Sequence, residues 1–425
     1  MGRKPTWRTL CLAALAVVTL AAARPAAAAD PIVLGVPTSL GVIEGKESLN
    51  AVKLAVDEIN AAGGVKVGGQ PRMFSVEEMD IRDASPGTPV PEALLGIEKM
   101  ILEKKPQAIV VGPFRSEALL AGMDIIAKYK VPLLGSIAMT PVSEKKIQED
   151  PEKYKYVFRT SINVTSWAGL LIGAMKGLQE KFGFTKVYLL NQDVLWARGT
   201  AGSMKAWFEK NGWEVLGHDQ FPTGASDFAP VLMKAKMGGA QVLFTCFDMP
   251  ESGILVKQWK GQKVPALMTG FISPMAGEGA WSAFEGKIGG LLNAIFELGN
   301  IPSPKYAPAT AFYDAYKKKY GKPVESGHGP APSYESVYIL KEAIEKAGSL
   351  DPDQLAAAIK ATDRQGVMGR IKFNEGNQVI YGQDPKDTAV GCIYQWGEKG
   401  ERTIVFPPAL ADAEVQLPPW MKSAK

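Results

Sequence analysis

Short apolar runs alternate with amphipathic segments along most of the chain. Residues 32–37 form a strand-like run, and after them Leu49, Val52, Val56 and Ile59 recur at helical spacing, with polar residues on the opposite face. The same succession of strand and helix then repeats several times. Regular alternation of this kind predicts parallel sheets that carry helices on both faces.

The remaining predicted strands are short runs rich in apolar residues: 73–79, 108–111, 132–135, 186–191, 214–217, 241–245, 266–269 and 289–296. The remaining predicted helices are amphipathic segments: 91–104, 117–128, 166–181, 199–210, 228–237, 252–259, 309–319, 334–346 and 352–361. A single sheet made of all these strands would be unusually wide. The sequence therefore predicts an α/β fold of two doubly wound parallel-sheet lobes.

The pattern is interrupted at three places. The polar strip 149–156 precedes a new series of strands and helices and gives a first boundary, and a proline-rich passage near Ile301 gives a second. Beyond Ala361, two strand-like runs at 369–373 and 389–396 flank a turn sequence, which predicts a strand, a turn and a strand.

The first 29 residues have the features of an export signal. Arg3, Lys4 and Arg8 precede an apolar run at 10–23, and small residues follow up to Ala29. The run of fourteen residues is shorter than the roughly 20 residues needed to span a bilayer. We therefore expect cleavage near Ala29 and localisation in the periplasm.

The charge balance argues against a polyanionic partner. The chain has 425 residues and a formal net charge of +4, and the expected signal contains four basic residues and no acidic one. The rest of the chain then carries 44 basic and 44 acidic residues. Without a net positive field, nucleic acid is not expected as a partner.

Residues suited to catalysis or metal binding are scarce. The only histidines are His218 and His328, and neither has a cysteine or histidine at zinc-site spacing. No serine occupies the centre of a Gly-x-Ser-x-Gly sequence. We therefore expect no enzyme, no metal and no cofactor. Whether Cys246 and Cys392 form a disulfide stays open, although separate buried thiols are favoured.

A set of short segments occurs over roughly 360 positions in an order and spacing typical of one family, although no single segment is specific to that family. The segments are residues 35–41, 57–64, 111–116, 132–141, 157–160, 191–193, 223–228, 334–338, 369–373 and 394–396. Together they resemble the extracytoplasmic solute-binding proteins of ABC importers for leucine, isoleucine, valine and related amides and organic acids.

This resemblance implies two lobes joined by three crossovers, with a solute in the cleft between them. It assigns residues 30–157 and 298–362 to lobe 1, and residues 158–297 and 363–425 to lobe 2. It also implies a monomeric receptor that delivers a small solute to an ABC permease in the inner membrane. The alternative is a ligand-sensing module of a receptor or regulatory system with the same fold, for which the sequence shows no spanning or kinase-like segment.

The resemblance also implies roles for residues that follow the predicted strands. Ser116 matches a serine that binds the ligand carboxylate from a helix start, and an ordinary helix N-cap is the alternative. Trp196 matches an aromatic wall over the ligand, and Tyr334 is expected to pack against the body of the solute. Met139 stands where a threonine commonly donates its hydroxyl, unless the neighbouring Thr140 takes that role. Ile137, from the same segment, is also expected at the site.

Departures from the family pattern bear on the solute. Ile272 or Phe271 falls where branched-chain amino-acid binders carry a glutamate for the ammonium group, and this loss argues against leucine. Glu44 and Asp248 are the acidic residues expected to receive an amine, and Arg198 and Arg115 are candidate partners for a carboxylate. A solvated rim is the alternative for these charges. The expected solute is an amino acid or a related amide or carboxylate.

Overall fold

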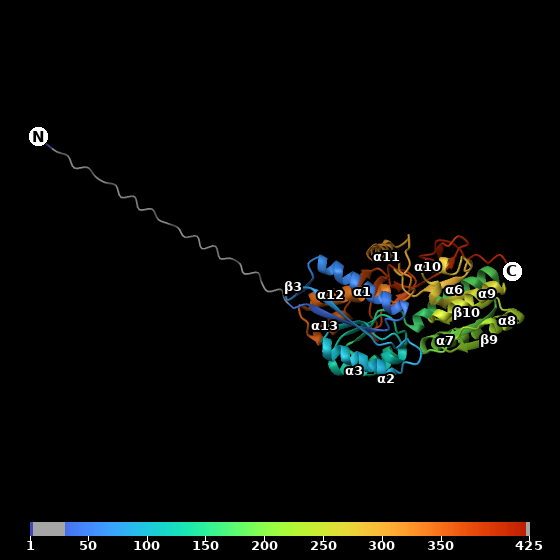
Figure 1. Ribbon diagram of the computed structural model, residues 1–425, viewed down its shortest axis with the longest axis horizontal. Coiled ribbons are helices and arrows are strands. Elements are labelled where there is room, and N and C mark those ends of the chain that lie inside the picture. The colour runs from blue at the N-terminus through green and yellow to red at the C-terminus, as the bar shows by residue number, and fades with distance from the viewer. Residues whose placement is uncertain (3–29, 422–425) are drawn as a thin grey trace.

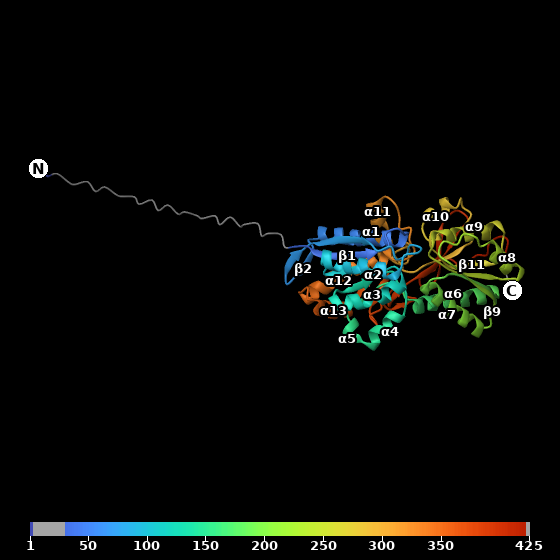
Figure 2. The ribbon, with the colours of Figure 1, turned by 60° about the horizontal axis from the view of Figure 1, so that its bottom comes forward.

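The computed structural model describes residues 1–2 and 30–421, so the expected export signal lies outside the described residues. The described chain forms two lobes that lie side by side along the long axis of the molecule (Figure 1). Each lobe contains a parallel sheet between helices, and Figure 2 shows the sheet with β1 (Ile32–Thr38) in one lobe and the sheet with β11 (Leu267–Ile272) in the other. The predicted α/β fold class is confirmed.

The first sheet has five parallel strands. Their order is β4 (Phe74–Asp80), β1, β5 (Ala108–Val111), β6 (Leu133–Gly135) and β7 (Val157–Arg159). The helices of this lobe are α1 (Ile43–Ala61), α2 (Val90–Lys99) with the π-helical turn η1 (Met100–Lys104), α3 (Ser116–Tyr129), α4 (Val142–Glu149), α5 (Pro151–Tyr154), α11 (Ala307–Tyr320), α12 (Pro330–Ala347) and α13 (Pro352–Lys360). The central strand β5 is buried at every position, because helices cover both faces of the sheet.

The second sheet has four parallel strands. Their order is β11, β10 (Val242–Phe247), β8 (Lys186–Gln192) and β9 (Glu214–Phe221). The helices of this lobe are α6 (Val164–Phe182), α7 (Leu195–Lys210), α8 (Ala229–Met237), α9 (Gly253–Gly261) and α10 (Gly279–Ala283). Two apolar clusters pack around this sheet, one containing Trp259 and the other Trp167, and both indoles are fully buried.

An antiparallel sheet of three strands adjoins the second parallel sheet. It consists of β12 (Leu292–Ile295), β17 (Cys392–Trp396) and β18 (Arg402–Phe406). The side chain of Asn293 joins β12 to β11, since its Oδ1 accepts from the backbone N–H of Ile272 at 2.9 Å and its Nδ2 donates to the carbonyl of Ile272 at 3.2 Å. The second lobe therefore combines parallel and antiparallel strands.

The predicted elements correspond to observed ones, and the differences lie in the short elements. The strand predicted at 108–111 has those bounds in the structure, whereas β7 was not predicted. This strand has three residues, too few to show a period, and it follows a polar strip that contains the four-residue helix α5.

The tail differs from the predicted strand, turn and strand. The run 369–373 contains β14 (Gly369–Lys372), which pairs with β13 (Asp363–Gly366) and meets β16 (Ala389–Val390) only at Gly369. The short strand β15 (Tyr381–Gly382) completes this small sheet, whereas β17 belongs to the antiparallel sheet with β12. The two predicted runs are strands, but they do not form one hairpin.

The apolar clusters suggest a division of the chain that differs from the expected boundaries. Phe158 belongs to the first cluster and Ile162 to a second-lobe cluster, which agrees with the expected first crossover to within a few residues. Apolar residues between 363 and 389, including Ile371, pack in the first cluster, whereas Val390 and Cys392 pack in the second lobe. We propose that the third crossover lies at residues 389–390 and not at residue 362.

The two cysteines of the described chain are free and buried. Cys246 packs in the cluster that contains Trp167, and Cys392 packs in the cluster that contains Trp259. Burial raises the pKa of both thiols, which suppresses the reactive thiolate.

We predict that the folded mature protein does not react with a thiol reagent such as DTNB, because both thiols are buried and protonated. Addition of denaturant should release two reactive thiols per chain, and a non-reducing gel should show no disulfide. Rapid labelling of the native protein would contradict this placement of the cysteines.

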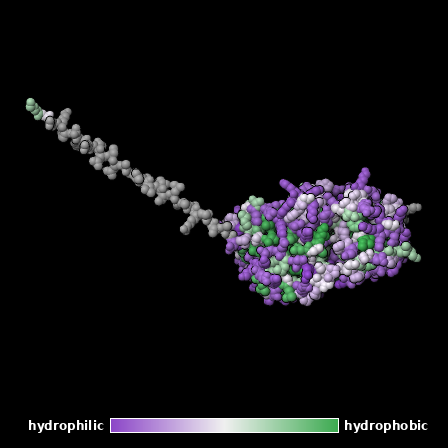
Figure 3. Space-filling model, in the orientation of Figure 1, coloured by the Kyte–Doolittle hydropathy of each residue, from purple (hydrophilic) through white to green (hydrophobic). Residues whose placement is uncertain are grey.

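Among the described residues, no helix is both long and apolar enough to cross a bilayer. Polar residues dominate the face seen in Figure 3, and apolar residues form small groups among them. The apolar residues that matter for the site lie instead between the lobes.

Candidate functional site

A cavity lies between the two lobes. Its lining comes from both lobes and comprises Glu44, Phe114, Ser116, Ile137, Ala138, Met139, Trp196, Asp248, Phe271, Phe296 and His328. Seven of the nine residues expected at the site are in this set, and the structure does not bring Thr140 or Tyr334 into it. A cleft between the lobes of such a fold is where open parallel sheets place their ligands.

The segment that follows β5 positions Ser116 at the cavity. Val111 has a φ of 71° and Gly112 a φ of 70°, so the chain turns sharply at the end of the strand. A positive φ is unusual for a β-branched residue such as valine, and strain of this kind is held where the surrounding structure requires it. The turn leads through Phe114 to the start of α3, where Ser116 is 4% exposed.

The start of α3 leaves hydrogen-bond donors unused. Ser116 is the first residue of the helix and Arg115 is the N-cap residue, which makes no side-chain cap hydrogen bond. No hydrogen bond of the Ser116 hydroxyl to another described residue is found, and the N-cap position belongs to Arg115 and not to Ser116. A free hydroxyl and free amides at a helix N-terminus favour an anion such as a carboxylate.

Aromatic rings from the second lobe form the opposite wall. Trp196 is the second residue of α7, and its ring centroid lies 6.2 Å from that of Phe271 and 6.0 Å from that of Phe296 in edge-to-face geometry. These rings offer flat apolar surface to the body of a solute. Phe114 adds an aromatic side chain from the first lobe.

An ion pair joins the two lobes at the edge of the cavity. Asp248 follows β10, and its carboxylate accepts from Arg115 through two bonds of 2.6 and 3.2 Å and from the indole Nε1 of Trp196 at 2.7 Å. Burial lowers the pKa of Arg115, but Asp248 and Asp83 more than offset this, and the net pKa is raised. The guanidinium is therefore always charged, and the bidentate pair is a strong contact between the lobes.

Glu44 makes a second contact between the lobes. It lies in the first turn of α1, is 1% exposed and accepts a hydrogen bond from the hydroxyl of Ser273, which directly follows β11. Burial raises the pKa of Glu44 to about 7, although the hydrogen bond from Ser273 acts in the opposite direction. The side chain therefore changes its charge near neutral pH.

Two of the expected residues have other roles. Thr140 uses its hydroxyl to accept from the backbone N–H of Val142 at 3.2 Å, and its carbonyl accepts from buried Arg159 at 2.7 Å. Tyr334 lies in α12, where its hydroxyl donates to Glu58 at 2.5 Å. Both residues stabilise the first lobe, and neither lines the cavity.

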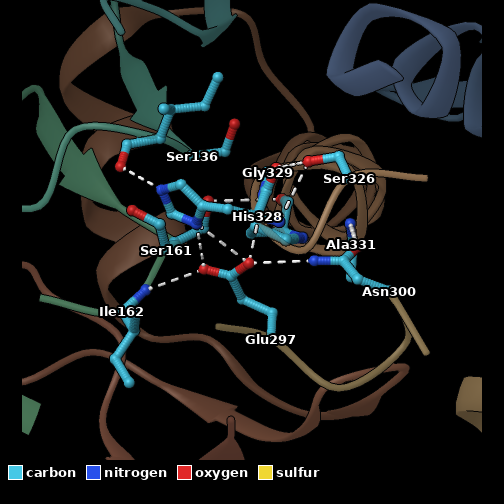
Figure 4. A network of polar contacts seen from close by, with 12 residues as sticks. Ser136, Ser161, Ile162, Glu297, Asn300, Ser326, His328, Gly329 and Ala331 are labelled. Carbon is cyan, nitrogen blue, oxygen red and sulfur yellow. Dashed lines mark hydrogen bonds and ion pairs between the residues drawn. The ribbon is translucent and has the colours of Figure 1, made fainter. Parts of the chain in front are cut away.

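His328 also lines the cavity, although it was not expected at the site from the sequence. Its Nε2 donates to the carbonyl of Ile137 at 2.7 Å, and its Nδ1 lies 2.9 Å from a carboxylate oxygen of Glu297 (Figure 4). Burial lowers the pKa of His328, but Glu297 more than offsets this and the net pKa is raised. Since both ring nitrogens face acceptors, the ring is held as an imidazolium.

The carboxylate of Glu297 connects segments from both lobes. It is fully buried and also accepts from the backbone N–H of Ile162 at 3.4 Å, from the side-chain amide of Asn300 at 3.1 Å and from the backbone N–H of Gly329 at 3.2 Å (Figure 4). Ile162 follows the first crossover, and Gly329 precedes α12 of the first lobe. The network lies where the chain passes between the lobes, and the spacing of these residues along the sequence offered no signal of it.

Within the described residues, no three His, Cys, Asp or Glu side chains are grouped so as to hold a metal ion.

Comparison with known proteins identifies the class of protein to which this fold and cleft belong. The sequence profile of the periplasmic binding protein family matches residues 33–383, and the chain belongs to this family. Members of the family are solute-binding proteins of ABC importers and are not enzymes. The resemblance to branched-chain amino-acid binding proteins is confirmed.

The leucine-, isoleucine-, valine-, threonine- and alanine-binding protein of Pseudomonas aeruginosa is 27% identical over 401 residues, which cover 92% of this chain and 96% of that protein. The branched-chain amino acid transporter substrate-binding protein of Streptococcus pneumoniae, solved in complex with isoleucine, is 24% identical with a TM-score of 0.70, and the match covers 89% of this chain and all of that one. A solute-binding protein of R. palustris, solved in complex with benzoate, is 15% identical with a TM-score of 0.72, and the match covers 91% and 99%. These structural matches establish the shared fold.

Proposed function

We propose that this protein is the periplasmic receptor of an ABC importer. It binds one small carboxylate solute, an amino acid or a related compound, between its lobes. It then passes the solute to a permease in the inner membrane. The observation that carries the proposal is the cavity between the lobes. The first lobe contributes an unpaired hydroxyl and free helix amides, and the second lobe contributes an aromatic wall.

The contacts across the cavity support a mechanism of lobe closure. Arg115 and Glu44 of the first lobe bind Asp248 and Ser273 of the second, so these contacts form only when the lobes meet. A solute that touches both lobes stabilises the closed form over an open one. The crossovers between the lobes are the places where such a hinge motion would occur.

The solute class follows from the two kinds of surface. Ser116 and the start of α3 suit a carboxylate, and Trp196 and Phe271 suit an apolar or aromatic body. Isoleucine and benzoate, the ligands of the two structural neighbours, each combine these features. We expect this receptor to bind a compound of the same general form.

Isothermal titration against amino acids and small organic acids tests the proposal. Ser116→Ala should weaken binding of the best solute by about 10- to 100-fold, because one hydrogen bond to a charged group is lost. Ser203→Ala, a change on the exposed face of α7, is the matched control and should leave the affinity unchanged. Equal affinities of wild type and Ser116→Ala would argue against this carboxylate position, and binding of no compound would argue against the receptor function. Size-exclusion chromatography should show a monomer.

A further inference from the structure

Asp248 and Glu44, the two acidic residues of the cavity, differ in how many of their oxygens are already used. Both carboxylate oxygens of Asp248 are bonded, one to Arg115 alone and the other to Arg115 and Trp196. The pair is well shielded, with 12% of the Arg115 side chain and 7% of the Asp248 side chain exposed. The charge of Asp248 is therefore already balanced by Arg115, and Asp248 is not available to bind a cationic group of the solute.

Glu44 has fewer hydrogen-bond partners. Its Oε1 accepts from Ser273, and the only other hydrogen bond to its carboxyl group within the described residues comes from the backbone N–H of Glu44 itself. The side chain lines the cavity and is 1% exposed, so a solute in the cavity can reach this carboxylate. A hydrogen-bond donor on the solute would give this carboxylate a further partner.

Building on the proposed receptor function, we propose that Glu44 is the specificity-determining residue that binds the amino group of the solute, while Asp248 holds the lobes together and does not contact the amine. The solute is then a zwitterionic amino compound, with its carboxylate at Ser116 and its ammonium at Glu44. Loss of the acidic residue near Phe271 is in this way compensated from α1, a different part of the fold.

The charged surroundings of Glu44 make this binding dependent on pH. Its pKa is raised to about 7, chiefly by burial and to a smaller extent by the charge of Asp248, while the hydrogen bond from Ser273 and the charge of His328 act in the opposite direction. Arg115 balances Asp248 and Glu297 balances His328, so Glu44 is the one group of this set whose charge is uncompensated when it ionises. On its own helix the nearest acid is Glu47, which accepts instead from the backbone N–H groups of residues 325 and 326 at 2.9 and 2.8 Å.

The sign of the effect follows from linkage. An ammonium group beside Glu44 favours the ionised carboxylate, so binding releases a proton from the fraction of Glu44 that is protonated. Affinity for an amino acid should therefore rise by about tenfold between pH 6 and pH 8. A carboxylate compound without the amino group is not stabilised by an ionised Glu44. It can instead accept a hydrogen bond from a protonated Glu44, so the affinity of the receptor for this compound should fall between pH 6 and pH 8.

The test compares two pairs of compounds that differ only in the α-ammonium group. We would titrate leucine against 4-methylpentanoate and phenylalanine against 3-phenylpropanoate at pH 6, 7 and 8. Wild type should prefer the amino compound at pH 8, and Glu44→Gln should reduce that preference by at least about 30-fold and remove its pH dependence.

Two control variants separate the roles of the acids. Glu47→Gln changes a buried glutamate of the same helix whose pKa is also raised to about 7 by burial, and it should leave both the preference and its pH dependence intact. Asp248→Asn should weaken both members of each pair by similar factors, because it loosens the closed form and not the amine site.

Each outcome decides between the alternatives. A stronger affinity of wild type for the deaminated acids at pH 8, or loss of the preference in Asp248→Asn but not in Glu44→Gln, would overturn the assignment of Glu44 and leave the receptor function standing. The wild-type pH series gives the same decision if the Glu44 variant does not fold. Absence of binding by all four compounds and by the wider amino-acid and organic-acid screen would instead contradict the receptor function.

Discussion

Glu297→Ala lowers the free energy of unfolding by about 3 to 5 kcal/mol, the largest effect on stability that we expect from a single polar substitution in this protein. The carboxylate is fully buried and accepts from His328, Asn300 and two backbone N–H groups. Its removal leaves a buried imidazolium and several donors without an acceptor. Chemical denaturation followed by fluorescence would measure the loss.

A double-mutant cycle with His328 provides the control for this prediction. Glu297→Ala combined with His328→Ala should cost less than the sum of the two single changes, because the second change removes the charge that the first left unpaired. Glu152→Ala removes a glutamate of an exposed pair with Lys155 and should change stability by no more than about 0.5 kcal/mol. Additive effects of the two buried changes would contradict the ion pair.

Trp196→Ala is the substitution expected to reduce solute affinity most. It removes the ring that packs on Phe271 and Phe296 at the wall of the cavity and the hydrogen bond to Asp248. Large aromatic residues at the centre of a binding site contribute about 2 to 4 kcal/mol, so we expect a loss of affinity of roughly 30- to 1000-fold. Titration with the best solute of the screen measures it.

Trp207→Ala is the matched control, because this tryptophan lies on the same helix but does not line the cavity. It should leave the affinity within about twofold of wild type. Unchanged affinity in both Trp196→Ala and Ser116→Ala would remove the cleft as the binding site.

Residues that follow a strand could be assigned to the site from the sequence, because the course of the backbone places them there. Ser116, Trp196 and Asp248 each follow a strand of a parallel sheet, and the carboxyl ends of such strands face the same crevice. The direction of a side chain on a helix was not predictable in the same way. Tyr334 is close to the start of α12, yet it turns to Glu58 in its own lobe.

Contacts between distant parts of the chain were also outside the reach of sequence patterns. Arg115 and Asp248 are 133 positions apart, and from the sequence each of them was expected to bind a charged group of the solute. In the structure the two side chains pair with each other. His328 stands alone in the sequence, and its role depends on Glu297, which is 31 positions away and carries no motif.

The tail shows the same limit at the level of a whole segment. The alternation around Ile371 predicted a strand, but which of the two lobes covers its apolar face depends on the partners available in three dimensions. The small sheet from β13 to β16 packs with the first lobe, and β17 then pairs with β12 in the second.

The alternation of apolar and polar positions by itself determined the class of fold, because the period of apolar residues depends on near neighbours in the chain. The resemblance of short segments in their order along the chain indicated the family. The tertiary structure decided which charges are paired and which polar atoms remain free in the cleft. These properties arise from contacts between side chains that are far apart in sequence, such as Glu44 with Ser273 and Arg115 with Asp248, and burial sets their strength.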